Sequence, residues 1–233
     1  MIFFRQLFDE SSSTYTYLLA DDDSHQAVLI DPVLGHDDLY LAILREQHFT
    51  LRYLLETHVH ADHITGASAL RRATGAQTAI SVESGATCAD LLLHGDELLH
   101  FGNEFIRVLA TPGHTPTCLS YLWRDRLFSG DALLIGGCGR TDFQGGDAGR
   151  LYDSITQKIW LLADETLIYP AHDYHHHHVS SVAQERESNP RLAGKSRDEF
   201  IAIMNQLDLP EPRLIDLAVP ANKHCGNEGI YAA

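Results

Sequence analysis

Four side chains of the kind that bind metals lie within the segment Thr57–His63, and this segment constrains the fold more than any other part of the chain. They are His58, His60, Asp62 and His63. The segment follows the apolar run Leu51–Glu56, which is typical of a buried strand, and precedes helical spacing of apolar residues over Ile64–Thr74. On an extended backbone the first two histidines point to the same side. We therefore expect a metal-binding turn after a strand, with Asp62 and His63 opening a helix whose positive end keeps Asp62 ionised.

Three further candidate ligands stand at the ends of predicted strands, each beside a glycine or proline that favours a turn. They are His114, Asp131 and His172. The carboxyl edge of a sheet is a common place for a functional site, and imidazole and carboxylate groups suit several transition metals. The sequence therefore predicts one metal site that is built from both halves of the chain.

Alternation of apolar residues predicts strands in both halves of the chain. They cover 2–7, 14–20, 26–31, 51–56 and 77–82 in the first half, and 105–110, 119–123, 126–129 and 166–169 in the second. Helical spacing is found over 36–48, 64–74, 150–162, 179–187 and 196–207, and the chain after 207 is predicted to be irregular. Two strand-rich halves, each followed by helices, predict a four-layer α/β/β/α sandwich.

Length and charge limit the domain count and the partners. A chain of 233 residues fits one well-buried domain, and we expect a single domain over 1–233 with a short helical C-terminal extension from about residue 179. The net charge of -15 opposes a phosphate backbone, which excludes nucleic acid as a partner. No apolar stretch approaches the roughly 20 residues needed to cross a bilayer, so we expect no membrane partner either.

The cysteines and the N-terminal segment give an expectation of the cellular compartment in which the protein is found. The four cysteines are scattered and form no C-x-x-C pair, so we expect reduced thiols rather than a disulfide scaffold. Met1–Phe8 carries only one basic residue and leads directly into a strand-like pattern, which is not typical of a signal or transit peptide. We therefore expect a cytoplasmic protein.

The order His58-x-His60-x-Asp62-His63, then His114, Asp131 and His172, resembles the signature of the metallo-β-lactamase superfamily. Four segments further resemble the persulfide dioxygenases, also called sulfur dioxygenases, of that superfamily. They are THVHADHITG (57–66), GGCGRTDFQ (136–144), YPAHDY (169–174) and VPANKHCG (219–226). The resemblance implies an α/β fold, the four-layer αββα metallo-β-lactamase sandwich, and covers almost the whole chain.

The resemblance implies that each chain binds one Fe(II) through His58, His114 and Asp131. It implies that the same three residues are the catalytic residues. His60, Asp62, His63 and His172 would surround these ligands or form a second-metal position. Two histidines and a carboxylate leave coordination positions open for substrate and dioxygen. The implied reaction, part of sulfide metabolism, oxidises glutathione persulfide with O2 to sulfite and glutathione. The alternative is a pair of zinc ions or mixed metals.

Four residues are candidates for supporting roles. Arg140 is the first candidate for substrate binding, because a guanidinium binds a carboxylate through two hydrogen bonds and glutathione has two carboxylates. Tyr174 contacts the glutathione moiety or caps the site. Thr115 and Asp173 would orient the ligand and the loop beside them. The run His175–His178 is expected to be a solvated loop.

Other activities of the superfamily fit less well. Glyoxalase II, a dinuclear-metal thioester hydrolase, is the nearest alternative, but its members usually have a longer, basic C-terminal helical domain. A β-lactamase would be periplasmic, and a nuclease would need a basic face. A non-catalytic scaffold would be expected to lack some of the ligands, and all seven positions are filled. The family resemblance also implies a homodimer.

Overall fold

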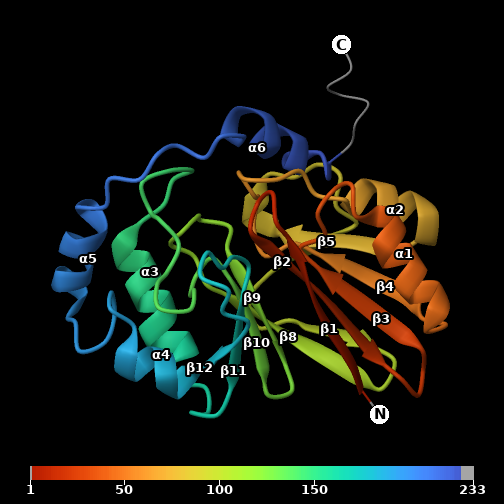
Figure 1. Cartoon of the computed structure of the whole chain (residues 1–233), viewed down its shortest axis with the longest axis horizontal. Helices are drawn as coiled ribbons and strands as arrows, with labels where there is room; N and C mark the ends of the chain where they lie inside the picture. The colour runs from red at the N-terminus through yellow and green to blue at the C-terminus, as the bar shows by residue number, and fades with distance from the viewer. Residues whose placement is uncertain (1, 227–233) are drawn as a thin grey trace. The chain divides into compact units, whose positions relative to one another are not determined.

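The computed structural model describes residues 2–226, which fall into two compact units (Figure 1). Unit 1 takes residues 2–93, 99–105 and 211–226, so it contains segments from both ends of the described chain. Unit 2 takes residues 94–98 and 106–210. The predicted metal-binding turn lies in unit 1, and the other three predicted ligands lie in unit 2.

The sheet of unit 1 has the strand order β1-β2-β3-β4-β5-β6. Its strands are β1 (Ile2–Asp9), β2 (Thr14–Asp21), β3 (Gln26–Ile30), β4 (Thr50–Leu55), β5 (Gln77–Ser81) and β6 (Leu91–Leu93). The first three strands are antiparallel, while β3 to β6 are parallel. A parallel strand requires a crossover connection. The helices α1 (Asp37–Glu46) and α2 (Ala67–Thr74) provide the first two crossovers.

Apolar spacing explains how these helices pack. In α1, the spacing of Tyr40, Ile43 and Leu44 places them on one face of the helix. This face is buried against β2–β4 in one hydrophobic cluster. In α2, Leu70 joins the same cluster, and the helix ends at Gly75, whose φ of +74° is the left-handed conformation that glycine tolerates. The turn Val82–Ser84 follows β5, and α6 (Ile215–Lys223) completes unit 1.

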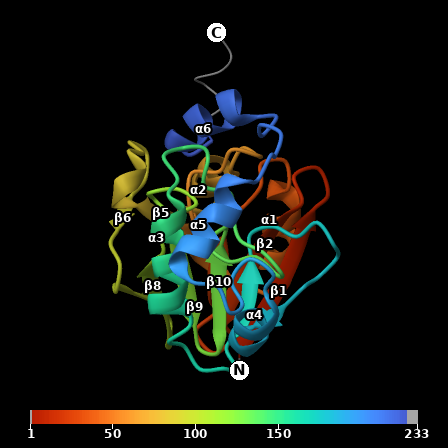
Figure 2. The ribbon, with the colours of Figure 1, turned by 90° about the vertical axis from the view of Figure 1, so that its left-hand side faces the viewer.

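The second sheet has the strand order β12-β11-β10-β9-β8-β7. Its strands are β7 (Leu98–Phe101), β8 (Glu104–Ala110), β9 (Leu119–Trp123), β10 (Arg126–Gly130), β11 (Leu167–Pro170) and β12 (Ser180–Ser181). Only β10 and β11 are a parallel pair among the pairings described here. Figure 2 shows α3 (Ala148–Ser154) and α5 (Arg197–Asn205) over β9 and β10. A π-helical turn (Ile155–Ile159) extends α3, and α4 (Val182–Ser188) follows β12.

Side-chain caps define where the helices of unit 2 begin. Asp147 accepts a hydrogen bond from the Arg150 amide at the start of α3. Ser196 and Glu199 form a reciprocal capping box at the start of α5. One hydrophobic cluster, which includes Ile168 of β11, Leu151 of α3 and Phe200 of α5, fixes these elements to the sheet.

Both mixed sheets are flanked by helices, which confirms the predicted α/β fold class. The predicted strands all form, and α4 and α5 lie where helices were expected. Three short strands, β6, β7 and β12, were not predicted, because two to four residues carry too little periodicity to recognise. The described residues contain no helix that is long and apolar enough to cross a bilayer.

Three predictions about local structure were wrong. α2 begins at Ala67 rather than Ile64, so Asp62 and His63 lie in the turn and not in the helix. The segment after 207 is not wholly irregular, since α6 forms there with Pro220 inside it. Cys88 and Cys225 form a disulfide across 137 residues, whereas reduced thiols were expected. Cys118 and Cys138 are buried and are not part of a disulfide among the described residues.

Candidate metal centre

The turn between β4 and α2 brings its four candidate ligands together within unit 1. The ring centroids of His58 and His60 are 4.0 Å apart, and those of His60 and His63 are 4.4 Å apart. Asp62 lies 2.9 Å from His63 Nδ1 and 3.8 Å from His60 Nδ1. The three histidines are almost fully buried. The predicted convergence of these side chains in this turn is therefore present.

Asp62 is held by hydrogen bonds rather than by a helix terminus. Its Oδ2 accepts hydrogen bonds from His63 Nδ1, at 2.9 Å, and from Thr14 Oγ1 of β2, at 3.0 Å. Because α2 begins at Ala67, its positive end is not at Asp62. Two donors thus replace the helix dipole that the sequence suggested as the stabilising partner of this carboxylate.

A buried carboxylate, Asp31, organises the start of the turn. It accepts hydrogen bonds from the Thr57 amide at 2.7 Å and from Thr57 Oγ1 at 2.8 Å. Since the single hydroxyl hydrogen of Thr57 goes to Asp31, this oxygen accepts from His58 Nδ1, 3.0 Å away. The His58 tautomer then carries its proton on Nδ1, and Nε2 carries the lone pair that a metal requires.

The same carboxylate lies next to His60 and Glu56. His60 Nε2 is 3.0 Å from Asp31 and 3.8 Å from Glu56. Burial alone would lower the pKa of His60, but the adjoining carboxylates, Asp31 foremost, raise it to about 9. Burial and the negative charge of Asp31 raise the pKa of Glu56 to about 8. Asp31 itself adopts a left-handed backbone with φ of +50°, which is uncommon outside glycine and frequent at functional sites.

Unit 2 brings together its own three candidate ligands. His172 Nδ1 lies 2.7 Å from Asp131 Oδ1, and His114 Nε2 lies 3.5 Å from Asp131 Oδ2. His114 Nδ1 donates to the Arg140 carbonyl oxygen at 2.6 Å, because a carbonyl can only accept. His114 therefore has the same tautomer as His58, with the lone pair on Nε2.

Two glycines allow this close approach. A Cβ on Gly139 would lie 2.8 Å from the His114 ring and would collide with the Asp131 carbonyl oxygen. A Cβ on Gly113, whose φ is +147°, would collide with Leu151 of α3. The glycine-rich loop before Arg140 therefore serves to let backbone pass directly beside the candidate ligands.

The predicted supporting residues of unit 2 lie in two loops. Thr115 is buried, and its hydroxyl is 2.9 Å from that of Thr117, so it stabilises the turn that follows His114. Asp173 accepts hydrogen bonds from the amides of His175, at 3.0 Å, and His177, at 2.6 Å, which curls the histidine run. Tyr174 is 65% exposed, and its ring stacks on His172 with centroids 6.2 Å apart. The run His175–His178 is exposed, as expected.

Arg140 already has several partners in the protein. Its guanidinium pairs with both carboxylate oxygens of Asp142, at 2.7 and 2.6 Å. It also donates to the carbonyl oxygens of Pro210, at 2.6 Å, and Leu209, at 3.1 Å. Only 14% of its side chain is exposed. A substrate carboxylate would therefore compete with Asp142 for this guanidinium.

The sequence analysis missed two residues that support the metal-binding turn, Asp31 and Asn222. Asp31 follows β3 at the same sheet edge as the turn after β4, and this strand-end position was a usable signal. Asn222 lies in a segment that was recognised only as a motif, and its side chain bonds to the backbone of the turn. No local pattern in the sequence indicates that contact.

Comparisons with known proteins show the family to which the chain belongs. Residues 11–172 match the family model described as the metallo-beta-lactamase superfamily. The chain is 50% identical over 230 residues to the mitochondrial persulfide dioxygenase ETHE1 of Mus musculus, covering 97% of this chain and 89% of the mouse protein. It is 28% identical over 264 residues to Glyoxylase B2 of Dictyostelium discoideum, covering 95% and 90% of the two chains.

A solved structure is also closely similar. The crystal structure of ETHE1 from Myxococcus xanthus matches with a TM-score of 0.95 and 55% sequence identity, and the match covers 97% of this chain and all of that one. An identity of about half across nearly the whole length exceeds that to the glyoxylase by a wide margin. The chain therefore belongs to the metallo-β-lactamase superfamily and, within it, to the persulfide dioxygenase family.

Proposed function

We propose that this protein is an iron(II)-dependent dioxygenase that oxidises glutathione persulfide with O2 and releases sulfite and glutathione. The observation that carries the proposal is the 50% identity, over 97% of the chain, to a protein named persulfide dioxygenase. An oxidoreductase that acts on a persulfide follows from this relationship. Iron as the metal and glutathione as the carrier are the finer parts of the proposal.

His58, His114 and Asp131 are the proposed iron ligands, with one iron per chain. The tautomers support this set, because the Nδ1 proton of each histidine is directed at a protein oxygen and each Nε2 carries a lone pair. Two imidazoles and one carboxylate form the donor set of non-haem iron(II) oxygenases. When bound, iron(II) supplies the redox chemistry that joins dioxygen to the terminal sulfur of the persulfide.

The remaining residues hold these ligands in place. Thr57 fixes the ring of His58, and the Arg140 carbonyl fixes that of His114. His172 lies 2.7 Å from Asp131 and orients its carboxylate. His60, Asp62 and His63 occupy the positions at which a hydrolase of the superfamily would hold a second metal, and we propose that here they surround a single metal site.

Four side chains are proposed to support substrate binding. Arg140 would bind a glutathione carboxylate if Asp142 yields one of its two contacts. Tyr174 is exposed on the loop that follows His172 and offers a ring and a hydroxyl to the carrier. Thr115 and Asp173 shape the loops that carry His114 and Tyr174.

Dinuclear thioester hydrolysis, the glyoxalase II reaction, is the alternative. The lower identity to Glyoxylase B2, 28%, supports persulfide oxidation over it. We further propose that the protein acts as a homodimer in the cytoplasm, although the mouse relative is named as a mitochondrial protein.

The test is oxygen consumption by anaerobically iron-loaded protein supplied with glutathione persulfide, with metal counted per chain. We expect oxygen uptake, sulfite release and about one iron per chain. Thioester hydrolysis on the same sample is the control reaction. Thioester cleavage without oxygen uptake, together with about two metals per chain, would replace the dioxygenase by a dinuclear hydrolase.

A further inference from the structure

Asn222, in the C-terminal helix α6, bonds to three backbone groups of the metal-binding turn, all within unit 1. Its Nδ2 donates to the His60 carbonyl at 2.9 Å and to the His63 carbonyl at 2.8 Å. Its Oδ1 accepts from the Thr65 amide at 2.9 Å. The residue is 5% exposed. Both hydrogens of its amide group and one lone pair of its oxygen are therefore used on a single turn.

The turn depends on such contacts because it lies outside regular secondary structure. Residues 58–63 belong neither to β4 nor to α2, so no sheet or helix ladder defines their backbone. Backbone amides and carbonyls that are buried need partners. A carboxamide supplies two donors and an acceptor in one plane, whereas aspartate supplies only acceptors and leucine, of similar shape, supplies neither.

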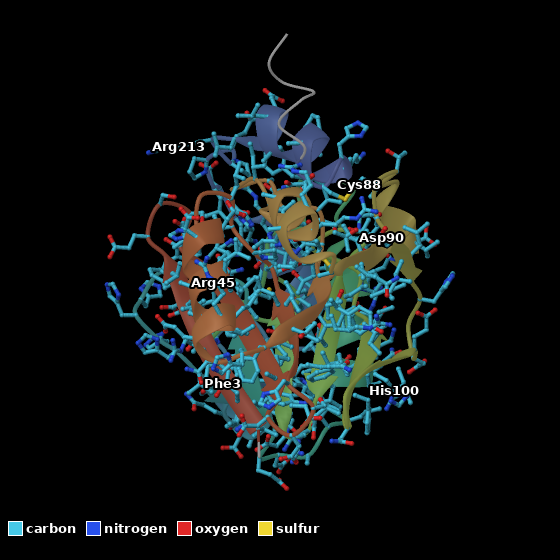
Figure 3. All side chains as sticks on the ribbon, turned by 90° about the vertical axis from the view of Figure 1, so that its right-hand side faces the viewer. Phe3, Arg45, Cys88, Asp90, His100 and Arg213 are labelled. Carbon is cyan, nitrogen blue, oxygen red and sulfur yellow. A yellow bond between two sulfur atoms is a disulfide. The ribbon has the colours of Figure 1, made fainter. Side chains whose placement is uncertain are left out.

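The segment around Asn222 is itself fastened to unit 1. Cys225 forms the disulfide with Cys88, and Figure 3 shows Cys88 beside the ribbon of this segment. The Cys225 carbonyl accepts from the Ser68 amide at 3.0 Å, which places the segment over the start of α2. Gly226 passes so close to Thr65 that an added Cβ would collide with the Thr65 carbonyl oxygen. These contacts hold Asn222 in register with the turn.

We propose that Asn222 is a positioning residue for the metal centre: it fixes the backbone at His60, His63 and Thr65, and so holds in place the turn that carries the proposed ligand His58. It acts through the backbone and does not itself bind metal or substrate. The inference rests on the proposed metal role of the turn, but not on the identity of the metal or on persulfide as the substrate.

The test compares metal binding with fold stability in the full chain. Asn222→Asp keeps the acceptor for Thr65 and removes both donors. Ala218→Gly is the matched control, since Ala218 is fully buried in the same helix and glycine weakens a helix. For each variant we would titrate apo-protein with Co²⁺ anaerobically, record the visible spectrum of bound Co²⁺, and measure the melting temperature of the apo-protein.

Asn222→Asp is expected to weaken Co²⁺ binding roughly 10- to 100-fold, as is usual for residues that orient metal ligands, and to alter the Co²⁺ spectrum. Ala218→Gly should lower the melting temperature while Co²⁺ affinity and spectrum stay close to those of the wild type. Should Asn222→Asp not fold, Asn222→Ser, which is neutral and smaller, is compared in the same way, and the same loss of affinity is expected.

Two outcomes overturn the inference in different ways. If Asn222→Asp, or its Ser substitute, binds Co²⁺ as tightly as Ala218→Gly does and with the wild-type spectrum, Asn222 only stabilises the fold, and the proposed function stands. If the wild-type chain binds no Co²⁺ at all, the proposed metal centre fails and the inference fails with it. If the iron-loaded wild-type chain does not oxidise glutathione persulfide, while Asn222→Asp weakens Co²⁺ binding as expected, the inference stands and only the proposed function is contradicted.

Discussion

The hydroxyl of Thr57 determines which ring nitrogen of His58 is available to a metal. Its hydrogen is directed at Asp31, so the ring proton of His58 is fixed on Nδ1. Neither Thr57 nor Asp31 is a proposed metal ligand. Each nevertheless decides which nitrogen of His58 is available to a metal, which is the usual effect of partners behind metal-binding histidines.

Replacing Thr57 by Val should therefore weaken metal binding. Valine has nearly the same shape but no oxygen to accept from His58 Nδ1 or to donate to Asp31. We expect about 10- to 100-fold weaker Co²⁺ binding by the apo-protein, measured by titration. Thr57→Ser, which retains the hydroxyl, is the control and should remain within a few-fold of the wild type. Equal affinities for the Val and Ser variants would exclude the hydroxyl as the cause.

The Arg140–Asp142 pair gives a test of substrate binding at the scale of one residue. If the guanidinium binds a glutathione carboxylate, Arg140→Ala should raise KM at least tenfold with little loss of iron, because a charge-assisted hydrogen bond contributes about 1.5–3 kcal/mol. Asp142→Asn should then lower KM, because Arg140 loses its competing carboxylate. Unchanged KM in both variants, with a lower melting temperature for Arg140→Ala, would assign Arg140 to holding Leu209 and Pro210 only.

At the scale of elements, Asp90 joins β5, β6 and α2 of unit 1. Its Oδ2 accepts from Thr78 N at 2.9 Å and from Thr78 Oγ1 at 3.0 Å, and its Oδ1 pairs with Arg71 of α2. Burial alone would raise the pKa of Asp90, but the hydrogen bonds from Thr78 and the charge of Arg71 lower it. Because the pKa is lower in the folded state, the ionised carboxylate stabilises the fold above its unfolded pKa.

Asp90→Ala should consequently destabilise the protein in a pH-dependent way. At pH 7 we expect a loss of about 1 kcal/mol in the free energy of unfolding, because this hydrogen-bonded carboxylate is exposed and partly screened by solvent. The difference from the wild type should shrink as the pH falls below about 4, where the unfolded state binds the proton first. Urea unfolding at several pH values measures this, with exposed Asp208→Ala as the control. A difference that stays constant down to acid pH would refute the charge contribution.

At the scale of the whole molecule, the chain was expected to form a single domain, and its described residues divide into two compact units. Unit 1 contains segments from both ends of the described chain, and the disulfide joins those segments. Unit 1 therefore cannot form from one continuous stretch of sequence. The single domain expected over residues 1–233 stays a prediction.

The positions of the tryptophans make this prediction testable. Both, Trp123 and Trp160, lie in unit 2, so fluorescence reports on that unit alone. Hydrogen exchange at β2–β4 reports on unit 1. A single domain should give coincident urea midpoints for the two probes. Two midpoints separated beyond error would mean that the units unfold independently and that the single-domain prediction was wrong.

The sequence by itself determined the parts of this protein that depend on near neighbours. Apolar alternation located nine strands, and the segment Thr57–His63 was placed correctly at the end of β4. His58 and His60 lie side by side, as their spacing of two residues predicted. Turn residues such as Gly113 and Gly136, both with positive φ, were recognisable because backbone conformation is a local property.

Only the tertiary structure decided the contacts between residues that are distant in sequence. The Cys88–Cys225 disulfide spans 137 residues, and Asn222 reaches Thr65 across 157. Thr14, which donates to Asp62, and Pro210, which accepts from Arg140, likewise come from distant segments. Hydrophobic periodicity indicates which face of a helix or strand is buried. It does not indicate which polar group from a distant segment will contact that helix or strand. That pairing is fixed only when the sheet, helices and loops have packed and every buried donor and acceptor must find a partner.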